Sequence, residues 1–275
     1  MTFSLVAADP ERGELGVAVA SKFPAIGALV PAVAVDVGAV ASQAVMNPAY
    51  RADGLALLAA GVDPESALER LADADPGAEE RQVAVVDAAG RAATRTGRRC
   101  VDWAGGRTGR GYAAQGNLLL SGATVDALCD AFERSGGRPL ADRLVEALAA
   151  GQAAGGDRRG QQAAALIVAR RGAGYGGSDV LVDLRVDDHP RAVDELCRLH
   201  ALHERHFGST PAERMLAVDA ALERELRDRL AARGYAGGRL AEDLMAWAVV
   251  ENLEERIDAA GRLDPVVLDV LRAEA

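Results

Sequence analysis

The chain has 275 residues, of which 49% are hydrophobic and 26% charged, and its 41 acidic and 31 basic side chains give a formal net charge of −10. This composition is that of an ordinary soluble globular protein with one large or two modest domains, so it excludes a disordered chain and a mini-protein. The negative charge opposes a phosphate backbone, and we therefore expect no nucleic-acid partner.

The cysteine content and the N-terminus indicate a cytoplasmic protein. The three cysteines are widely spaced and lack a C-x-x-C pair, which argues against a disulfide framework or a zinc site. Charged residues follow from Asp9 onward, so we predict neither a secretory signal nor a membrane partner. The apolar stretch Phe23–Met46 is interrupted by Asp36, prolines and glycines, which favours strands over a membrane helix.

The first part of the chain predicts strands and then a helix. Two apolar runs, Thr2–Ala8 and Leu15–Ser21, flank the turn-forming segment Asp9–Glu14, a pattern typical of a β-hairpin. Further strands are expected up to about Met46. A helix is predicted to begin at Asp63-Pro64, because Asp is a favoured N-cap and Pro a favoured first helical residue.

The middle of the chain predicts a second hairpin and two helices. Gln82–Asp87 and Arg91–Thr96 indicate the hairpin, and Gly111–Leu120 indicates a further strand. Apolar residues at helical spacing predict one helix around Leu128 and another around Leu144.

Strands and a helix follow the glycine pair at residues 155 and 156. Ala163–Ala169 and Val180–Val186 are the predicted strands, and His189-Pro190 opens the helix. Because hairpins outnumber strand–helix–strand crossovers, we expect an α+β fold of stacked sheets flanked by helices, not a doubly wound parallel sheet.

The best candidate for a domain boundary is Phe207–Pro211. Thr210 and Glu213, with Pro211 between them, form a capping box that predicts a new helix. Two apolar stripes follow, around Leu226 and Leu244, so the tail is expected to be a small all-helical domain. The predicted domains are residues 1–207 and 208–275.

A glycine-rich segment and a group of three histidines do not predict a cofactor or a metal site. The glycine-rich segment Gly172–Gly177 leads into a β-rich run, whereas a phosphate-binding loop needs a helix directly behind it. His200, His203 and His206 spread over about a third of a helix circumference and converge poorly on one ion, which favours a polar helix face. We therefore predict no cofactor and no metal site.

Thr2 is the candidate nucleophile, because no histidine occurs before residue 189 to complete a Ser-His-Asp or Cys-His triad there. Removal of Met1 would leave a threonine whose α-amine, titrating at about 7.7 to 8.0, can act as a general base. The alternative is that Thr2 is simply a strand residue. Lys22, the only lysine of the chain, ends the second strand and is expected beside Thr2, although it also fits a solvated surface position.

Six segments together resemble a known family. They are Thr2–Ala7, Leu15–Phe23, Gln43-Ala44 with Asn47–Tyr50, Gln115–Asn117, Gly156–Gln162 and Val182–Pro190. As an ensemble they resemble the DUF1028 family over most of residues 1–205. That family is assigned to the Ntn-hydrolase-like superfamily, so the resemblance implies a four-layer αββα sandwich and an N-terminal nucleophile, and leaves the substrate open.

The resemblance also implies roles for individual residues. Thr2 matches the nucleophile, Lys22 lies near the basic residue of the proteasome-type branch, and Asn117 is the candidate oxyanion donor. Ser21 is a departure, since proteasome-type sites carry an acidic residue in this part of the second strand. We expect five residues to bind substrate: Ser21, Gln43, Asn47, Asp157 and Arg159. Asp157 and Arg159 also fit a simple ion pair.

The expected function rests on the N-terminal strand led by Thr2, the lack of a histidine in this region and the family resemblance. It is an amidohydrolase that attacks a small amide or ureido compound through Thr2; the alternative is a non-catalytic binding or scaffold protein with the same fold. Residues 209–275 resemble a peptidoglycan-binding-like helical domain, for which a dimer contact or a lid is an equal alternative. The apolar segment Phe23–Val40 and the tail suggest more apolar surface than one chain buries, so a homodimer is expected.

Overall fold

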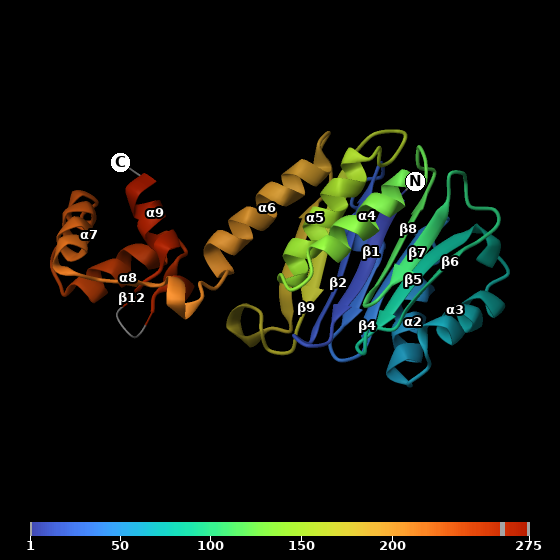
Figure 1. Cartoon of the computed structure of the whole chain (residues 1–275), viewed down its shortest axis with the longest axis horizontal. Coiled ribbons are helices and arrows are strands. Elements are labelled where there is room, and N and C mark those ends of the chain that lie inside the picture. Colours follow the sequence, from blue (N-terminus) through green and yellow to red (C-terminus); the bar gives the residue numbers. More distant parts are fainter. Residues whose placement is uncertain (1, 259–261, 274–275) are drawn as a thin grey trace. The chain divides into compact units, whose positions relative to one another are not determined.

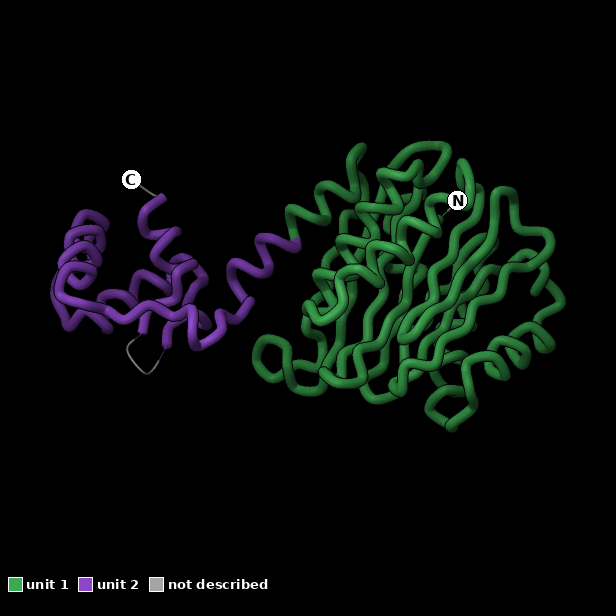
Figure 2. Tube along the Cα trace, viewed as in Figure 1, with its two compact units in different colours: residues 1–199 green, residues 200–275 purple. Residues whose placement is uncertain are grey.

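The computed structural model describes residues 2–258 and 262–273. The chain divides into two compact units, Met1–Leu199 and His200–Ala275, which Figure 2 shows in different colours. This division falls within helix α6 (Ala192–Phe207), somewhat before the boundary expected from the sequence.

The first unit is built on a six-stranded antiparallel sheet. Its strands are β1 (Thr2–Asp9), β2 (Glu14–Ser21), β7 (Gly105–Gly109), β8 (Tyr112–Asn117), β9 (Ala163–Ala169) and β10 (Val180–Val186). They lie in the order β10-β9-β2-β1-β8-β7, so the predicted N-terminal hairpin occupies the centre of the sheet. β1 is therefore held by a strand on each side.

A second, four-stranded antiparallel sheet faces the first. Its strands are β3 (Pro31–Ala34), β4 (Gly38–Ala44), β5 (Arg81–Asp87) and β6 (Ala92–Thr96), in that order. β5 and β6 form the second predicted hairpin, with Gln82 opposite Thr96. The predicted β-rich stretch after residue 23 also contains one short helix, α1 (Ile26–Leu29).

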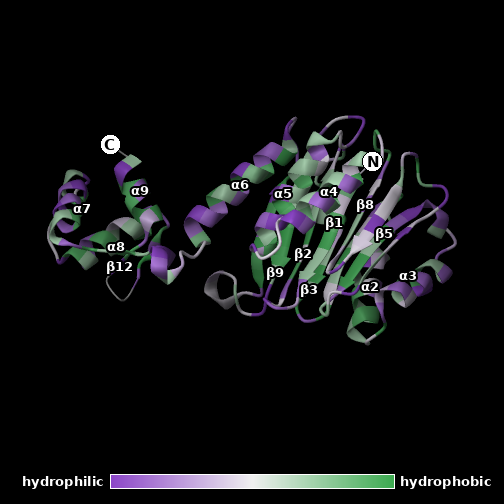
Figure 3. Cartoon of the chain, in the orientation of Figure 1, coloured by the Kyte–Doolittle hydropathy of each residue, from purple (hydrophilic) through white to green (hydrophobic). Residues whose placement is uncertain are grey.

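Helices cover the outer face of each sheet and complete four layers (Figure 1). α4 (Ala123–Arg134) and α5 (Leu140–Ala153) pack on the six-stranded sheet. α2 (Ala49–Ala59) and α3 (Pro64–Asp73) pack on the four-stranded sheet. The expected α+β sandwich is confirmed. Figure 3 shows that α4 and α5 combine hydrophobic and hydrophilic residues, whereas β2 and β9 are largely hydrophobic.

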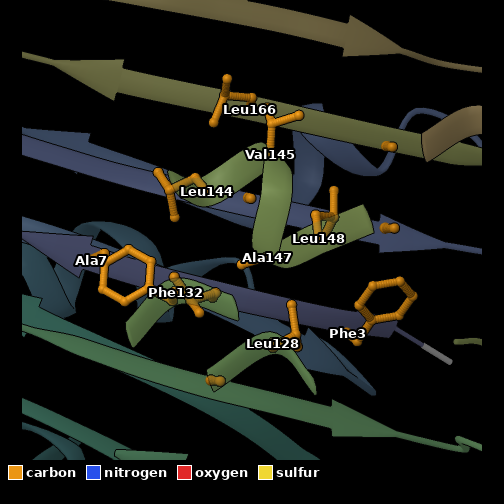
Figure 4. Close-up of a cluster of buried hydrophobic side chains, with 14 of the residues drawn as sticks. Phe3, Ala7, Leu128, Phe132, Leu144, Val145, Ala147, Leu148 and Leu166 are labelled. Carbon is orange, nitrogen blue, oxygen red and sulfur yellow. The ribbon is translucent and has the colours of Figure 1, made fainter. Parts of the chain in front are cut away.

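Alternation along β1 decides which core each side chain enters. Phe3 and Leu5 are buried against the helix layer, and Figure 4 shows Phe3 beside Leu128 and Leu148. Val6 points the opposite way, into the core between the sheets. Full burial of one such large apolar side chain stabilises the fold by about 2 kcal/mol. Because successive side chains alternate, Thr2 and Ser4 also face the second sheet.

Local signals explain which elements the sequence predicted. α3 begins as expected, since the Asp63 side chain accepts a hydrogen bond from the Ser66 backbone at 3.0 Å and Pro64 is the first helical residue. α2 was not predicted: Pro48 provides no side-chain cap, and the residue that accepts a backbone N–H at the helix start is Asn47. β7 was not predicted either, because its three glycines give little strand preference and pairing with β8 holds it in place.

The described part of the second unit contains the end of α6 and the helices α7 (Ala220–Ala232), α8 (Leu240–Val250) and α9 (Pro265–Ala273). A short ladder joins β11 (Leu216–Ala217) to β12 (Arg262–Leu263), which the sequence did not predict. These elements surround their own core, which includes Leu226, Leu230, Trp247, Leu268 and Leu271. None of the helices in the described ranges has the length and apolar character needed to cross a membrane.

The predicted capping box at Thr210 and Glu213 is wrong. Ala212–Arg214 forms only a short 3-10 turn, and α7 begins after Asp219, whose side chain accepts the hydrogen bonds of an N-cap. The Thr210 hydroxyl instead accepts a hydrogen bond from Arg256 at 3.3 Å. The Thr210 side chain therefore makes a tertiary contact instead of the helix cap that the local pattern predicts.

Candidate functional site

The pairing of β1 with its neighbours places Thr2 between two polar residues. Thr2 lies opposite Ser21 on β2 and opposite Asn117 on β8. Its hydroxyl oxygen is 3.1 Å from that of Ser21, within hydrogen-bond distance. Thr2 is 4% exposed and Ser21 2% exposed, so the two hydroxyls form a nearly buried pair at the end of the central hairpin.

A network of hydrogen-bonded amide side chains holds the backbone of Thr2 in place. Gln43 Nε2 donates to the Thr2 carbonyl oxygen at 3.2 Å and to Gln82 Oε1 at 2.8 Å. Asn117 Nδ2 donates to the same Gln82 oxygen at 2.9 Å and to the Thr2 carbonyl at 3.5 Å. Ser4 closes the network, because its hydroxyl donates to Gln43 Oε1 at 2.7 Å. The strand that carries the candidate nucleophile is thus tied to both sheets.

This network accounts for two of the predicted site residues. Gln43 contacts Thr2 directly and also borders the cavity described below. Both amide hydrogens of Asn117 have an acceptor, so an oxyanion would compete with the long 3.5 Å bond to the Thr2 carbonyl. The oxyanion role of Asn117 stays a prediction. Gln82, which joins the two amides, was not singled out in the sequence.

A cavity of about 240 Å³ opens over the hydroxyl pair. The polar residues in its lining are Thr2, Ser21 and Gln43. The other lining residues are apolar: Phe23, Ile26, Leu29, Val30, Ala44 and Met46. The cavity walls therefore come from the segment after β2 and from the end of β4 with the residues after it. These segments meet only in the folded chain, so periodicity alone did not reveal the cavity.

The backbone around the cavity adopts uncommon conformations. Ala44 has a φ of 70° and Ala25, immediately before α1, a φ of 52°. Residues with a side chain rarely occupy this left-handed region, and they persist there only where the surrounding structure holds them. The Ala25 backbone N–H, for example, donates to the Asp187 carbonyl at 2.9 Å. The walls of the cavity are thus formed by constrained backbone.

Lys22 follows Ser21 in sequence, but its ammonium bonds elsewhere. We expected Lys22 opposite the start of β1, and the register places Ser21 there instead. Lys22 is exposed, and its Nζ donates to the Gln161 carbonyl at 3.1 Å. Among the hydrogen bonds of the described residues, none joins this ammonium to Thr2. Its catalytic role stays a prediction.

Asp157 and Arg159 pair with one another next to the C-terminal end of β2. Arg159 Nη2 lies 3.2 Å from Asp157 Oδ2, and the Arg159 backbone N–H donates to Oδ1 at 2.8 Å. The same carboxylate accepts a bond from the Lys22 backbone N–H at 2.9 Å. The ion pair proposed as one alternative is therefore present. A substrate-binding role for the two residues remains a prediction.

Asn47 does not line the cavity, and its side chain instead bonds to Asp75 and to the start of α2. Its Nδ2 donates to Asp75 Oδ2 at 3.1 Å, and its Oδ1 accepts from the Ala49 backbone N–H at 3.1 Å, where α2 begins. Hydrogen bonds from Arg81, and then from Gly77 and Asn47, hold the pKa of Asp75 well below its usual range. Substrate binding by Asn47 also stays a prediction.

The remaining motifs of the sequence lie in a turn and on a helix. Gly172–Gly177 ends in a short 3-10 turn, Tyr175–Gly177, that leads into β10 rather than into a helix. The three late histidines lie on α6. Within the described residues, no group of three or more histidine, cysteine or acidic side chains is arranged to hold a metal ion.

Comparisons with known proteins agree on one family. Residues 2–196 match the model described as "Family of unknown function (DUF1028)", and residues 209–271 match a "Putative peptidoglycan binding domain". A crystal structure of a protein from Silicibacter pomeroyi, titled as a DUF1028 member, is 31% identical with a TM-score of 0.67. That match covers 74% of this chain and 89% of that protein. No curated protein matches the chain.

Proposed function

Because the chain belongs to the DUF1028 family, we propose that its first unit is an amidohydrolase of the Ntn type, which cleaves a small amide or ureido compound through Thr2. The observation that carries the proposal is the Thr2 hydroxyl at the base of a cavity, 3.1 Å from Ser21. Its carbonyl oxygen accepts a hydrogen bond from Gln43. A hydroxyl with open space on one side and a fixed backbone on the other suits a nucleophile.

The proposed reaction needs only groups that the chain supplies and water. Removal of Met1 frees the Thr2 α-amine, which in its neutral form accepts the hydroxyl proton while Oγ1 attacks the substrate carbonyl carbon. The tetrahedral intermediate collapses, the C–N bond breaks, and the ammonium passes its proton to the leaving nitrogen. Water, deprotonated by the same amine, then hydrolyses the Thr2 ester and regenerates the hydroxyl.

The neighbouring residues have distinct proposed roles. Ser21 orients the Thr2 hydroxyl through the hydrogen bond between them. Asn117 donates to the oxyanion, and Lys22 supplies a positive charge that favours the neutral amine. Ser21 is also proposed to bind substrate, together with Gln43, Asn47, Asp157 and Arg159.

Two Thr2 variants test the proposal. Thr2→Val keeps the shape of the side chain without the hydroxyl, and Thr2→Ser keeps a hydroxyl. We expect wild type and Thr2→Ser to hydrolyse members of a panel of amides and ureido compounds, and Thr2→Val to fall to background. Intact mass is measured on each protein, because processing must be equal. Equal activity of Thr2→Val, or an active protein that retains Met1, would contradict the proposal.

The alternative is a non-catalytic binding or scaffold protein that uses its second unit to hold peptidoglycan or a partner. The match of residues 209–271 to a peptidoglycan-binding domain model favours it, as does the neutral Ser21. Purified cell-wall sacculi should then retain the full chain, and soluble wall fragments should release it. Retention of the full chain on sacculi, with no hydrolysis of any substrate by wild type or Thr2→Val, would support the scaffold function alone.

Two further features stay predictions alongside this proposal. They are the homodimer and the cytoplasmic location. Neither decides between the catalytic and the scaffold function.

A further inference from the structure

The apolar residues that line the cavity over Thr2 have no role in the chemistry described so far. We propose that they form an acyl pocket, so that the substrate is the amide of a short, apolar carboxylic acid. Ureido compounds and amides with a charged acyl chain are then poor substrates. This inference rests on the proposed Thr2 chemistry, and it selects among the substrates that chemistry allows.

The chemistry of the walls carries the inference. Phe23, Ile26, Leu29 and Val30 come from the segment after β2, and Met46 comes from the segment after β4. None of the described residues that line the cavity is charged, and the polar ones among them are Thr2, Ser21 and Gln43. A charged chain placed against such walls would lose its hydration without gaining a partner. A ureido nitrogen would likewise leave N–H groups unpaired.

The size of the cavity limits the chain length. Its volume of about 240 Å³ is below that of typical sites for drug-sized ligands. At about 30 Å³ per water-sized group, it has room for roughly eight such groups. After allowance for the carbonyl group, acyl chains of about four to six carbons fit best.

The position of the nucleophile decides which half of the substrate enters. Thr2 is itself part of the cavity lining, so an acyl group esterified to its hydroxyl has this space directly beside it. The leaving amine can then depart from the open side. The constrained backbone at Ala25 and Ala44 supports a preformed pocket, which lowers the cost of ordering its walls on binding.

A chain-length series on the wild-type protein tests the pocket without any mutation. The substrates are anilides of acetic, propionic, butyric, hexanoic and decanoic acids, with phenylurea and the anilide of succinic acid for comparison. We expect kcat/KM to rise about fourfold per added methylene, up to about six carbons, and then to fall. Phenylurea and the succinyl compound should be at least as poor as the acetyl compound.

A binding experiment separates this inference from the proposed function. In Thr2→Val, which lacks the nucleophile, primary carboxamides from acetamide to hexanamide are titrated by calorimetry or NMR. The Kd should again fall about fourfold per methylene. Met46→Lys should weaken hexanamide binding at least tenfold. Val45→Lys is the matched control, since Val45 is 57% exposed, does not line the cavity, and should leave the Kd unchanged.

The outcomes distinguish the two claims. Thr2-dependent hydrolysis that is indifferent to chain length, or that prefers phenylurea, would overturn the acyl pocket and leave the nucleophile in place. Chain-length-dependent binding in a protein that hydrolyses nothing would support the pocket and reject the proposed function. Equal effects of Met46→Lys and Val45→Lys on binding would also overturn the pocket.

Discussion

At the scale of single residues, the site depends on which side chain lies opposite Thr2. Ser21 holds that place, and it provides a neutral hydroxyl where proteasome-type sites carry an acid. Among the described residues, no carboxylate is bonded to the Thr2 hydroxyl, so in the proposed mechanism the α-amine itself accepts the hydroxyl proton. In this arrangement the pKa of the amine sets the lower limit of the active pH range.

Lys22 gives the first prediction at this scale. A positive charge near the amine disfavours the ammonium form, so Lys22→Met should raise the pKa of the amine. The acid limb of the kcat/KM profile should then move to higher pH, with little change at the plateau. Lys22→Arg, which keeps the charge, is the control and should follow wild type. Superimposable profiles for all three proteins would mean that Lys22 only holds the Gln161 carbonyl.

Part of the site could be predicted from the sequence and part could not. The tight turn of the first hairpin fixes the register, so the pairing of Thr2 with Ser21 is a local consequence of the chain. The expectation for Lys22 was wrong by one residue, and one residue reverses side-chain direction in a strand. Gln82 and Met46 approach Thr2 only because the two sheets stack, a long-range result that no local pattern reports.

At the scale of elements, the amide network between the sheets is the feature that fixes β1. Gln82 accepts hydrogen bonds from Gln43 and Asn117, and it donates to the Gly116 carbonyl at 2.7 Å. Gln82 itself is fully buried. Buried polar groups of this kind are costly to leave unpaired, so the network makes the alignment of the two sheets specific.

Gln82→Leu should therefore destabilise the first unit by about 3 kcal/mol, because amide hydrogens of Gln43 and Asn117 would lose their acceptor. Urea unfolding followed by circular dichroism measures the change. Gln162→Leu is the control, since that side chain bonds Asp188 at the surface and its loss should cost less than about 0.5 kcal/mol. Equal midpoints for Gln82→Leu and wild type would show that the network contributes nothing to stability.

Asp75 gives a prediction for the loop that joins α3 to β5. Arg81, on β5, bonds its carboxylate at 2.8 Å, and these bonds lower its pKa in the folded state. A lowered pKa means that the stabilisation is complete above the unfolded value near 3.9 and is lost as the pH falls through the lower folded value. Asp75→Asn should cost about 2 kcal/mol at pH 7.

The pH dependence of the stability difference tests whether the ionised Asp75 carboxylate accounts for this cost. Urea midpoints of wild type and Asp75→Asn are compared from pH 7 down to pH 2. The difference between the two proteins should stay constant to about pH 4 and then shrink. A difference that is independent of pH over this whole range would contradict the role of the ionised carboxylate.

Element prediction succeeded where local chemistry decides and failed where pairing decides. β9 and β10 have the predicted bounds, because an apolar run in β9 and an apolar–polar alternation in β10, each between turn residues, suffice to define them. β7 is held by its pairing with β8. The start of α2 was missed although the Asn47 side chain accepts a hydrogen bond from the Ala49 backbone N–H there. The order of the strands in each sheet is a tertiary property, and the sequence indicated layers without that order.

At the scale of the whole molecule, we predict that the chain forms a homodimer. β3 ends the four-stranded sheet, and its residues are only partly buried. Such an edge strand offers backbone groups for pairing, and a twofold dimer is the commonest closed assembly. Light scattering should give twice the chain mass of 28.5 kDa at micromolar concentration. A mass of 28.5 kDa across a wide concentration range would show a monomer.

The two units carry two different functional indications. The first unit holds the Thr2 site and the cavity, and the second matches a peptidoglycan-binding domain model. Each has its own hydrophobic core, so each is expected to keep its fold when the other is altered. Loss of hydrolysis and loss of wall binding should therefore be separable by mutation.

The central claim is that Thr2 is a nucleophile with a free α-amine, and intact-mass spectrometry with a β-lactone tests it most directly. The lactone carbonyl forms an ester with an activated hydroxyl, and a short alkyl substituent suits the cavity. We predict a protein mass without Met1, a single adduct that peptide mapping places on Thr2, and no adduct in Thr2→Val. Met1 retained on protein that hydrolyses amides, or an adduct that persists in Thr2→Val, would contradict the account.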